Sequence, residues 1–333
     1  MEYRILGSTG LKVSVICVGA MTFTEKGWRT AGSMDFSEIK RVVDTAIDNG
    51  VNFFDTADIY AFGESEELLG KALGDKKNDV IIATKVRGVM SEDPNDRGLS
   101  RYHIFKSIDK SLKRLGRDYI DLYQVHWWDN FTPIEETLEA LNDLVRMGKV
   151  RYIGISDFAG WQIARSVTLQ EMKGYSKFVS AQMYYSLLGR DIEFEVVPAC
   201  QHLGLGILAW SPLAGGFLTG KYSRENLPED SRYARMEKPF LRFDFEKGYF
   251  VVDELRKIAQ KYEASVSQVA LNWVKSKPFI SSIIIGVRSV NQLLDNLGCV
   301  SWDLSEEDVE YLDQITQVER PYPQWFLDMF ADL

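Results

Sequence analysis

Short apolar runs recur at regular intervals along the 333-residue chain. Within each run most positions are apolar rather than alternating with polar ones, which is typical of strands buried on both faces of a parallel sheet. We predict eight such strands in the runs VSVICVG from Val13, NFFDT from Asn52, VIIATK from Val80, YIDLYQVH from Tyr119, RYIGIS from Arg151, FVSAQMYY from Phe178, GILAWS from Gly206 and SSIIIG from Ser281.

Segments with the period of an amphipathic helix lie between these runs. In residues 35–50 the apolar positions mark one face, and Gly50 follows as a stop signal. Residues 101–116 and 133–149 repeat that pattern, each with a glycine near its end. Buried strands that alternate with helices, without a linker rich in Pro, Gly or Ser, favour one closed (β/α)8 TIM barrel over two open sheets. We therefore predict a single barrel domain over residues 1–333.

Three segments lie outside this repeat. The opening YRILGSTGLKVS, with a turn at Ser8 to Gly10, is expected to form a hairpin that caps the barrel floor. The polar stretch from Leu213 to Lys247 is expected to be a long functional loop after the seventh strand. Beyond the eighth strand we expect extra C-terminal helices and an aromatic tail, RPYPQWFLDMFADL, that either folds over the barrel or contacts another subunit.

Composition and charge narrow the class of protein. With 45% hydrophobic and 26% charged residues, the chain is typical of a globular protein in water. A net charge of −9 argues against nucleic acid or an anionic membrane as the main partner, because both need a basic face. The chain has no run of 18 apolar residues and no signal peptide at its start, which favours a cytoplasmic location.

Cysteines and histidines are few and widely spaced. The three cysteines, Cys17, Cys200 and Cys299, show no metal-binding spacing and fit a reducing compartment as apolar filler. The three histidines form no HxxxH or HExxH motif. We therefore predict no metal site.

Polar residues follow the predicted strands where each one ends. In a barrel the carboxyl ends of all strands meet at one face, which carries the chemistry. Taken singly, each polar residue is explained about equally well as a capping group or as a functional residue. An acid, a lysine and a histidine buried together, however, cost free energy unless they pair. The residues at these strand ends are Asp55, Lys85, His126, Ser156, Asp157, Gln182, Trp210 and Ser211.

Tyr60, just after the second strand, gives this set a chemical purpose. A phenol titrates near pH 10, and a neighbouring Lys85 ammonium held by Asp55 would stabilise the phenolate and lower that pKa. A shift of two units corresponds to about 3 kcal/mol, within reach of one desolvated charge pair. His126 would hold a substrate oxygen by hydrogen bond. A proton donor, a cation that lowers its pKa and a hydrogen-bond donor to the substrate oxygen are suited to carbonyl reduction.

No side chain donates hydride, so this chemistry needs a cofactor. The chain has no GxGxxG after a strand, which excludes the Rossmann mode of binding. Gly215, Gly220 and Lys221 match GxxxxGK, but Tyr222 stands where a P-loop needs Ser or Thr for magnesium. We therefore reject nucleotide hydrolysis, although a glycine-rich loop of this kind can still cradle a pyrophosphate.

The chain resembles the aldo-keto reductases along nearly its full length, including the branch of the potassium-channel β subunits and bacterial enzymes. The matching stretches are YRILGSTGLKVSVICVGAM, FFDTADIYAFGESEELLGKAL, VIIATK, SLKRLGRDYIDLYQVHWWD, GKVRYIGISDF, AWSPLAGGFLTGKY and IIIGVRSVNQLLDNL. The resemblance implies a catalytic tetrad of Asp55, Tyr60, Lys85 and His126, with Tyr60 as proton donor. This agrees with the chemistry inferred from the strand ends.

The resemblance also implies where a nicotinamide cofactor would bind. Trp210 would stack on the nicotinamide, with Ser156, Asp157 and Gln182 at its carboxamide. The pyrophosphate would be lined by Ser211, Pro212, Leu213, Gly215, Lys221 and Arg232. The adenosine end would be formed by Gly286, Arg288, Gln292, Asp295 and Asn296. Further cofactor contacts would come from Gly19, Ala20, Met21 and Asp55.

Two departures from the family pattern bear on the cofactor. Asp157 stands where many members have Asn, so one amide donor is lost. A lysine common near Gly286 in other branches is absent, which leaves Arg288 as the main candidate to bind a 2′-phosphate. We therefore expect NADPH in preference to NADH.

The substrate is expected to be a small carbonyl compound, an aldehyde or a ketone, with keto sugars included. Aromatic side chains would line an apolar or sugar-stacking pocket, and the competing interpretation is that half of them only pack. These residues are Phe23, Trp28, Phe62, Trp127 and Trp128. The alternative function is a regulatory subunit that binds the cofactor as a redox sensor, because the chain is similar to the potassium-channel β subunits in the same motifs. A barrel glycosidase would give Lys85 and Tyr60 no role.

Overall fold

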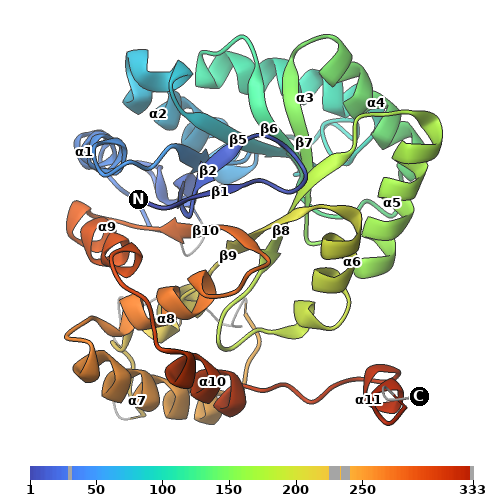
Figure 1. Ribbon diagram of the computed structural model, residues 1–333. Coiled ribbons are helices and arrows are strands. Elements are labelled where there is room, and N and C mark those ends of the chain that lie inside the picture. Colours follow the sequence, from blue (N-terminus) through green and yellow to red (C-terminus); the bar gives the residue numbers. More distant parts are fainter. Residues whose placement is uncertain (29–31, 225–232, 234–240, 331–333) are drawn as a thin grey trace.

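A computed structural model describes residues 1–28, 32–224, 233 and 241–330 of the chain. Eight parallel strands close into a barrel in the order β10-β3-β4-β5-β6-β7-β8-β9, with helices around the outside (Figure 1). The barrel strands are β3 (Ile16–Gly19), β4 (Phe53–Asp55), β5 (Ile81–Val86), β6 (Ile120–Val125), β7 (Val150–Ser156), β8 (Phe178–Tyr184), β9 (Gly206–Trp210) and β10 (Ile280–Gly286). The predicted (β/α)8 TIM barrel is confirmed.

The helices begin and end at the signals that the sequence carries. Asp35 caps the first helix by accepting a hydrogen bond from the Glu38 amide, and Gly116 ends the third in the left-handed region at φ +63°. The α-helices are α1 (Phe36–Asp48), α2 (Glu64–Leu73), α3 (Arg101–Leu115), α4 (Ile134–Arg146), α5 (Gly160–Lys173), α6 (Val196–Leu203), α7 (Phe245–Lys261), α8 (Val266–Lys275), α9 (Val290–Leu297), α10 (Glu306–Ile315) and α11 (Gln324–Asp328).

A hairpin of β1 (Tyr3–Ile5) and β2 (Lys12–Ser14) closes the barrel floor, as predicted. Leu6 and Val13 from this hairpin are fully buried in a small apolar cluster with residues from the barrel interior. Gly7 adopts φ +54°, and a Cβ added there would lie only 2.3 Å from the Val179 carbonyl oxygen. The hairpin therefore packs directly against the first residues of the strands.

The run from Val13 to Gly19 was predicted as one strand, and this prediction is wrong in its boundaries. Ser14 pairs with Tyr3 in the hairpin, whereas the barrel strand begins at Ile16 and pairs with β10. An unbroken apolar pattern cannot mark this change of partner, because both segments are buried.

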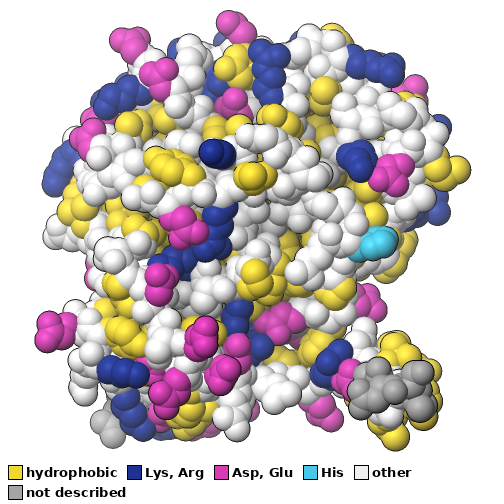
Figure 2. All heavy atoms as spheres, viewed as in Figure 1, with side chains coloured by type: hydrophobic (Ala, Val, Ile, Leu, Met, Phe, Trp, Pro, Cys, Tyr) yellow, Lys and Arg dark blue, Asp and Glu magenta, His cyan; other side chains and the backbone are white. Residues whose placement is uncertain are grey.

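The long loop after β9 begins with a 3-10 turn at Ala214–Thr219, and its end, from Phe245, already belongs to α7. The aromatic tail forms the short helix α11, which lies away from the barrel (Figure 1). The prediction that the tail folds over the barrel is therefore wrong for the single chain. Figure 2 shows apolar side chains gathered at this tail, with Tyr322 72% exposed and Trp325 49% exposed.

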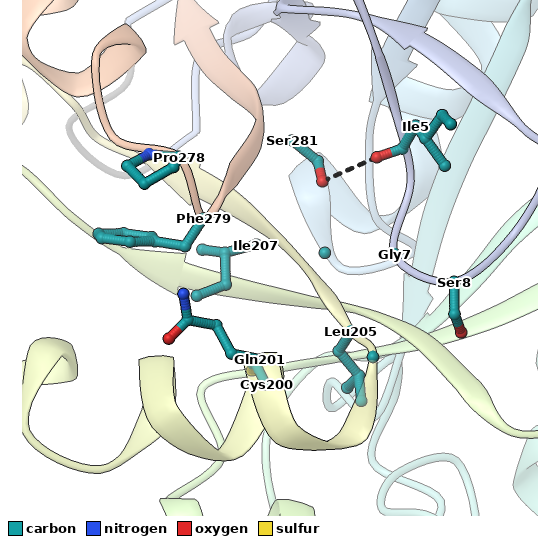
Figure 3. A pocket seen from close by; sticks show the side chains of 12 residues that line it. Ile5, Gly7, Ser8, Cys200, Gln201, Leu205, Ile207, Pro278, Phe279 and Ser281 are labelled. Atoms are coloured by element: carbon teal, nitrogen blue, oxygen red, sulfur yellow. Dashed lines mark hydrogen bonds between the residues drawn. The ribbon is translucent and has the colours of Figure 1, made fainter.

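A hollow of about 300 Å³ lies at the floor of the barrel (Figure 3). Its lining includes Ile5 and Gly7 of the hairpin and Gly206 at the start of β9. Because catalytic groups of barrels gather at the opposite, C-terminal ends of the strands, this hollow belongs to the structural end of the molecule. Within the described ranges, no helix combines the length and the apolar character needed to cross a bilayer.

Candidate active site

The Lys85 ammonium is the centre of a buried cluster at the C-terminal ends of β4 and β5. Its Nζ donates to Asp55 Oδ1 at 2.5 Å, to the Thr56 carbonyl oxygen at 2.8 Å and to Tyr60 Oη at 3.2 Å. The Lys85 side chain is fully buried and that of Asp55 is 3% exposed. The structure thus brings together the acid, the cation and the phenol that the sequence analysis placed side by side.

Two glutamines hold the other oxygen of Asp55. The side-chain amides of Gln124 on β6 and Gln182 on β8 donate to Asp55 Oδ2 at 3.0 and 2.8 Å. Gln124 was missed by the sequence analysis, although a glutamine inside the apolar run IDLYQV is the kind of signal that marks a polar group facing a barrel interior. The contact of Gln182 with Asp55 was not predicted either, and its role at a carboxamide stays a prediction.

Burial and charge act in opposite directions on Lys85 and Tyr60. Burial alone would lower the pKa of Lys85, but Asp55 and Tyr60 outweigh it and the pKa is raised, so the lysine stays charged. Burial is also the largest influence on Tyr60 and raises its pKa, against the opposing effect of Lys85. Lys85 does act to lower the pKa of Tyr60, as predicted, but the prediction of a lowered net pKa is wrong, because the loss of hydration outweighs the effect of the lysine.

His126 completes the predicted tetrad in space. Its ring lies edge-on to Tyr60, with 5.7 Å between the ring centres, and its backbone amide donates to the Val86 carbonyl oxygen at 3.0 Å. Trp28 approaches Tyr60 from another side, at 5.4 Å between ring centres. The Trp127 ring lies 4.7 Å from His126. Two of the predicted pocket aromatics therefore flank the tetrad.

The remaining predicted pocket aromatics differ in their surroundings. Trp128 packs against Phe158 and Trp161, at 5.1 and 5.5 Å between ring centres. Phe62 is 64% exposed. Phe23 is fully buried in the main hydrophobic core, so in this structure it packs and does not line the mouth of the barrel.

Side chains at the ends of β7, β8 and β9 meet beside the tetrad. Trp210 Nε1 donates to Asp157 Oδ1 at 3.0 Å, and Ser156 Oγ donates to Asp157 Oδ2 at 3.3 Å. The Trp210 ring lies 5.2 Å from that of Tyr184. These contacts place the predicted nicotinamide-binding side chains around one edge of the mouth.

The turn after β9 has the shape expected of a phosphate cradle. Ser211, Ala214, Gly215 and Gly216 all have positive φ, so the backbone turns tightly here. The amides of Ala214 and Gly216 hold the turn by donating to the carbonyl oxygens of Ser211 and Leu213, at 2.8 and 2.9 Å. A Cβ added at Gly216 would lie 3.5 Å from the ammonium of Lys221, so that cation stands beside the turn. A tight glycine-rich turn beside a cation fits a pyrophosphate, and the contacts with one stay predictions. Pro212 is buried, Leu213 is half-buried, and Arg232 lies outside the described residues.

The end of β10 provides the predicted adenosine-binding residues. Gly286 is exposed, with nothing within 4 Å of an added Cβ, and it pairs with Gly19 at the end of β3. The Arg288 amide donates to Gln292 Oε1 at 2.9 Å, which orders the start of α9. Asp295 on that helix accepts hydrogen bonds from Ser265 and Gln268 of α8, and the nearby Asn296 is buried. Their contacts with a cofactor stay predictions.

Ala20 and Met21 lie in a 3-10 turn, Ala20–Thr22, that follows β3. The Ser65 hydroxyl donates to the Ala20 carbonyl oxygen at 2.6 Å, and Thr22 Oγ1 donates to the Val287 carbonyl oxygen at 2.8 Å. This turn is thereby fixed to both α2 and the end of β10.

A second layer of buried polar groups supports the loop that carries Tyr60. Glu66 on α2 accepts hydrogen bonds from Thr84 Oγ1 and from Arg114 Nε, each at 2.6 Å. Asp58 is 1% exposed, and among the described residues neither of its carboxylate oxygens has a hydrogen-bond donor. Burial, followed by repulsion from Glu66, raises the pKa of Asp58 well above its usual value. This layer was not predicted, because its members come from separate helices and strands.

The three cysteines are free and buried, as expected for apolar filler. Burial raises the pKa of the Cys200 and Cys299 thiols to about 12, so neither is a reactive thiolate. No group of acidic, histidine or cysteine side chains in the described parts of the chain has the arrangement of a metal site.

Comparison with known proteins agrees with this geometry. The model of the aldo/keto reductase family matches residues 15–317. An uncharacterized oxidoreductase of Bacillus subtilis, YrpG, is 41% identical over 328 residues, covering 95% of this chain and 96% of the relative. A probable voltage-gated potassium channel subunit beta of Oryza sativa is 36% identical over 326 residues, covering 95% and 97%. A putative aryl-alcohol dehydrogenase of Schizosaccharomyces pombe is 36% identical over 338 residues, covering 94% and 95%. With its barrel and its strand-end cluster, the chain belongs to the aldo/keto reductase family of oxidoreductases, which use a nicotinamide cofactor.

Proposed function

We propose that this protein is an NADPH-dependent reductase that converts an aldehyde or a ketone to the alcohol, with Tyr60 as proton donor. The observation that supports it most directly is the buried contact of Lys85 Nζ with both Asp55 and Tyr60. The relative from Schizosaccharomyces pombe is itself named as an aryl-alcohol dehydrogenase. The proposal extends to keto sugars as substrates and to the cytoplasm as the location.

The bound cofactor supplies the hydride, and the side chains of the chain handle the proton. Tyr60 gives its proton to the alkoxide oxygen that forms from the carbonyl, while His126 donates a hydrogen bond to that oxygen. The raised pKa of Tyr60 does not prevent this transfer, because an alcohol is a far weaker acid than a phenol. The charged Lys85 then stabilises the phenolate left behind, and Asp55 holds the lysine in place.

The same reasoning sets the pH dependence of the two directions. Reduction needs Tyr60 protonated, which its raised pKa ensures at neutral pH. Alcohol oxidation needs the phenolate as a base, so it is expected to speed up as the pH rises toward the tyrosine pKa. We therefore propose reduction as the favoured direction at neutral pH.

The proposal is tested by following the absorbance of the reduced nicotinamide over a panel of aldehydes and ketones, with NADPH and NADH in turn. Tyr60→Phe is expected to lower kcat by about 10²- to 10⁴-fold, the usual contribution of a general acid, while the Kd for NADPH changes little. Tyr311→Phe is the matched control, since this tyrosine is 37% exposed and its hydroxyl donates to Glu254 of α7, away from the candidate site. Wild-type rates in Tyr60→Phe would refute the assigned role.

A second candidate function is a redox-sensing subunit, and the 36% identity to a potassium channel subunit beta favours it. In that case the chain would bind the cofactor but turn over slowly. Negligible turnover across the whole panel, together with a protein partner recovered from a pull-down, would support this function over the reductase.

A further inference from the structure

Asp157 places a carboxylate at the mouth of the barrel. It follows β7 directly, with φ +52°, and its backbone amide donates to the Gln182 carbonyl oxygen at 3.1 Å. Both carboxylate oxygens accept hydrogen bonds from neutral donors, Oδ1 from the Trp210 indole and Oδ2 from the Ser156 hydroxyl. The left-handed backbone suits Asp and Asn better than most residues, so the position is tightly defined.

The negative charge of Asp157 is not cancelled by a direct ion pair. Within the described ranges, no lysine, arginine or histidine nitrogen lies within 4.0 Å of its carboxylate. Lys85 attracts it only from a distance, since the lysine ammonium is already bonded to Asp55. Asp157 also acts electrostatically on Tyr60, which shows that its field reaches the reacting centre. The Asp55, Lys85 and Asp157 side chains together carry one net negative charge.

A nicotinamide ring is cationic when oxidised and neutral when reduced, so this charge distinguishes the two forms. Resting on the proposed function, we infer that the Asp157 carboxylate makes the protein bind the oxidised nicotinamide cofactor more tightly, relative to the reduced one, than an uncharged residue would. A carbonyl reductase gains from this preference. Tighter binding of the oxidised form makes the bound couple a stronger reductant and shifts the on-protein equilibrium toward the alcohol.

The expected size of the effect follows from Coulomb's law. A unit charge several ångströms from the ring, in a site of intermediate dielectric that is partly open to water, corresponds to about tenfold in relative affinity. Asp157→Asn should remove this factor and little else. An asparagine tolerates the same backbone, its Oδ1 can accept from Trp210, and its Nδ2 can donate to Ser156.

The preference should disappear in acid. Although part of the Asp157 residue is exposed to water, the protein around its carboxylate limits the hydration and raises the pKa of Asp157 to about 6. Lys85 from β5 and Tyr60 from the loop after β4 interact electrostatically with it, and both keep their charge state across this range. His126, which follows β6 and contacts Tyr60, belongs to the same cluster and is present in both wild type and Asp157→Asn, so the comparison of the two isolates Asp157. Below about pH 6 the side chain is neutral, and the oxidised cofactor loses its advantage.

The test is to measure, by isothermal titration calorimetry, the Kd values of NADP⁺ and NADPH for the wild type and Asp157→Asn. Both are titrated about one to two units above and below the Asp157 pKa of about 6. The 2′-phosphate also titrates near pH 6, but it is common to both cofactors and cancels in the ratio of Kd values. Asp109→Asn is the matched control, because it removes a carboxylate that is 62% exposed and pairs with Lys149.

At the higher pH, Asp157→Asn should shift the ratio by about tenfold toward NADPH, while Asp109→Asn leaves it unchanged. At the lower pH the wild-type and Asp157→Asn ratios should converge. An unchanged ratio in Asp157→Asn at high pH would overturn the inference while leaving the proposed function intact. No binding of either cofactor to the wild type would instead refute the proposed function. If Asp157→Asn does not fold, a wild-type ratio that stays constant with pH overturns the inference.

Discussion

Removal of the Lys85 charge tests the buried cluster most directly. Lys85→Met leaves the Asp55 carboxylate buried with two glutamine donors but without its cation. Breaking a buried ion pair by removing one partner costs about 3–5 kcal/mol of stability. Adding Asp55→Asn removes the stranded charge, so the double variant should recover about 2 kcal/mol of that loss.

Urea unfolding followed by tryptophan fluorescence measures these changes for the four members of the cycle. The matched control is the pair Lys40 and Asp44 on α1, which has the same N–O distance of 2.5 Å but is 42% and 35% exposed. Its coupling energy should be about 0.3–0.5 kcal/mol, as for exposed helix pairs. If Lys85→Met and Asp55→Asn destabilise additively, within about 0.5 kcal/mol, then the buried charges are not coupled and the reasoning fails.

Three further predictions concern cofactor binding, the hairpin at the floor of the barrel and the loop that carries Tyr60. Arg288→Ala should raise the KM for NADPH about tenfold or more and that for NADH little, measured by steady-state kinetics, and equal effects would mean that the arginine does not bind the phosphate. Gly7→Ala should lower the free energy of unfolding by at least about 2 kcal/mol, because Gly7 has a φ of +54° and an added Cβ would collide with the Val179 carbonyl oxygen. Gly10→Ala is the control: Gly10 has open space around it, so this change should have little effect in the same urea assay. Asp58→Asn should stabilise the protein by about 1 kcal/mol or more at neutral pH, and it should have no such effect near pH 4. Because folding raises the pKa of this carboxyl, the wild-type fold becomes less stable as the pH rises above the unfolded pKa of about 3.9. A gain of the same size at both pH values would contradict the burial of Asp58 as an acid.

The barrel was predictable because its signals are local. Each strand is a short apolar run, and several of the intervening helices end at a glycine, so alternation alone indicated the fold. The split near Ser14 was not predictable, since two buried strands with different partners have the same pattern. The placement of α11 away from the barrel was not predictable, because a run of aromatic residues is compatible with a packed tail and with an exposed one.

Most members of the candidate site could be predicted from the sequence, but the net effect of burial and charge on their pKa values could not. Strand ends converge in any barrel, so Asp55 and Lys85 could be placed together from the sequence. The direction in which the Tyr60 pKa shifts could not be predicted, because it depends on how far the effect of burial outweighs that of the lysine charge. Gln124 was missed because the sequence analysis considered only the residues at the strand ends, whereas this glutamine lies within β6 and bonds to Asp55 two strands away.

The hydrogen bonds to Asp55 come from β5, β6 and β8, while Asp55 itself ends β4. Lys85 lies on the neighbouring strand, whereas Gln124 and Gln182 lie two and four strands away around the barrel, so neither half of the chain, taken alone, contains all of these donors. The position of Asp55, and with it that of Lys85, therefore depends on contacts from both halves of the chain. Among the described residues, the donors to Asp55 all lie on strands, so loops other than the one that carries Tyr60 can vary in sequence to accept another substrate without altering these contacts.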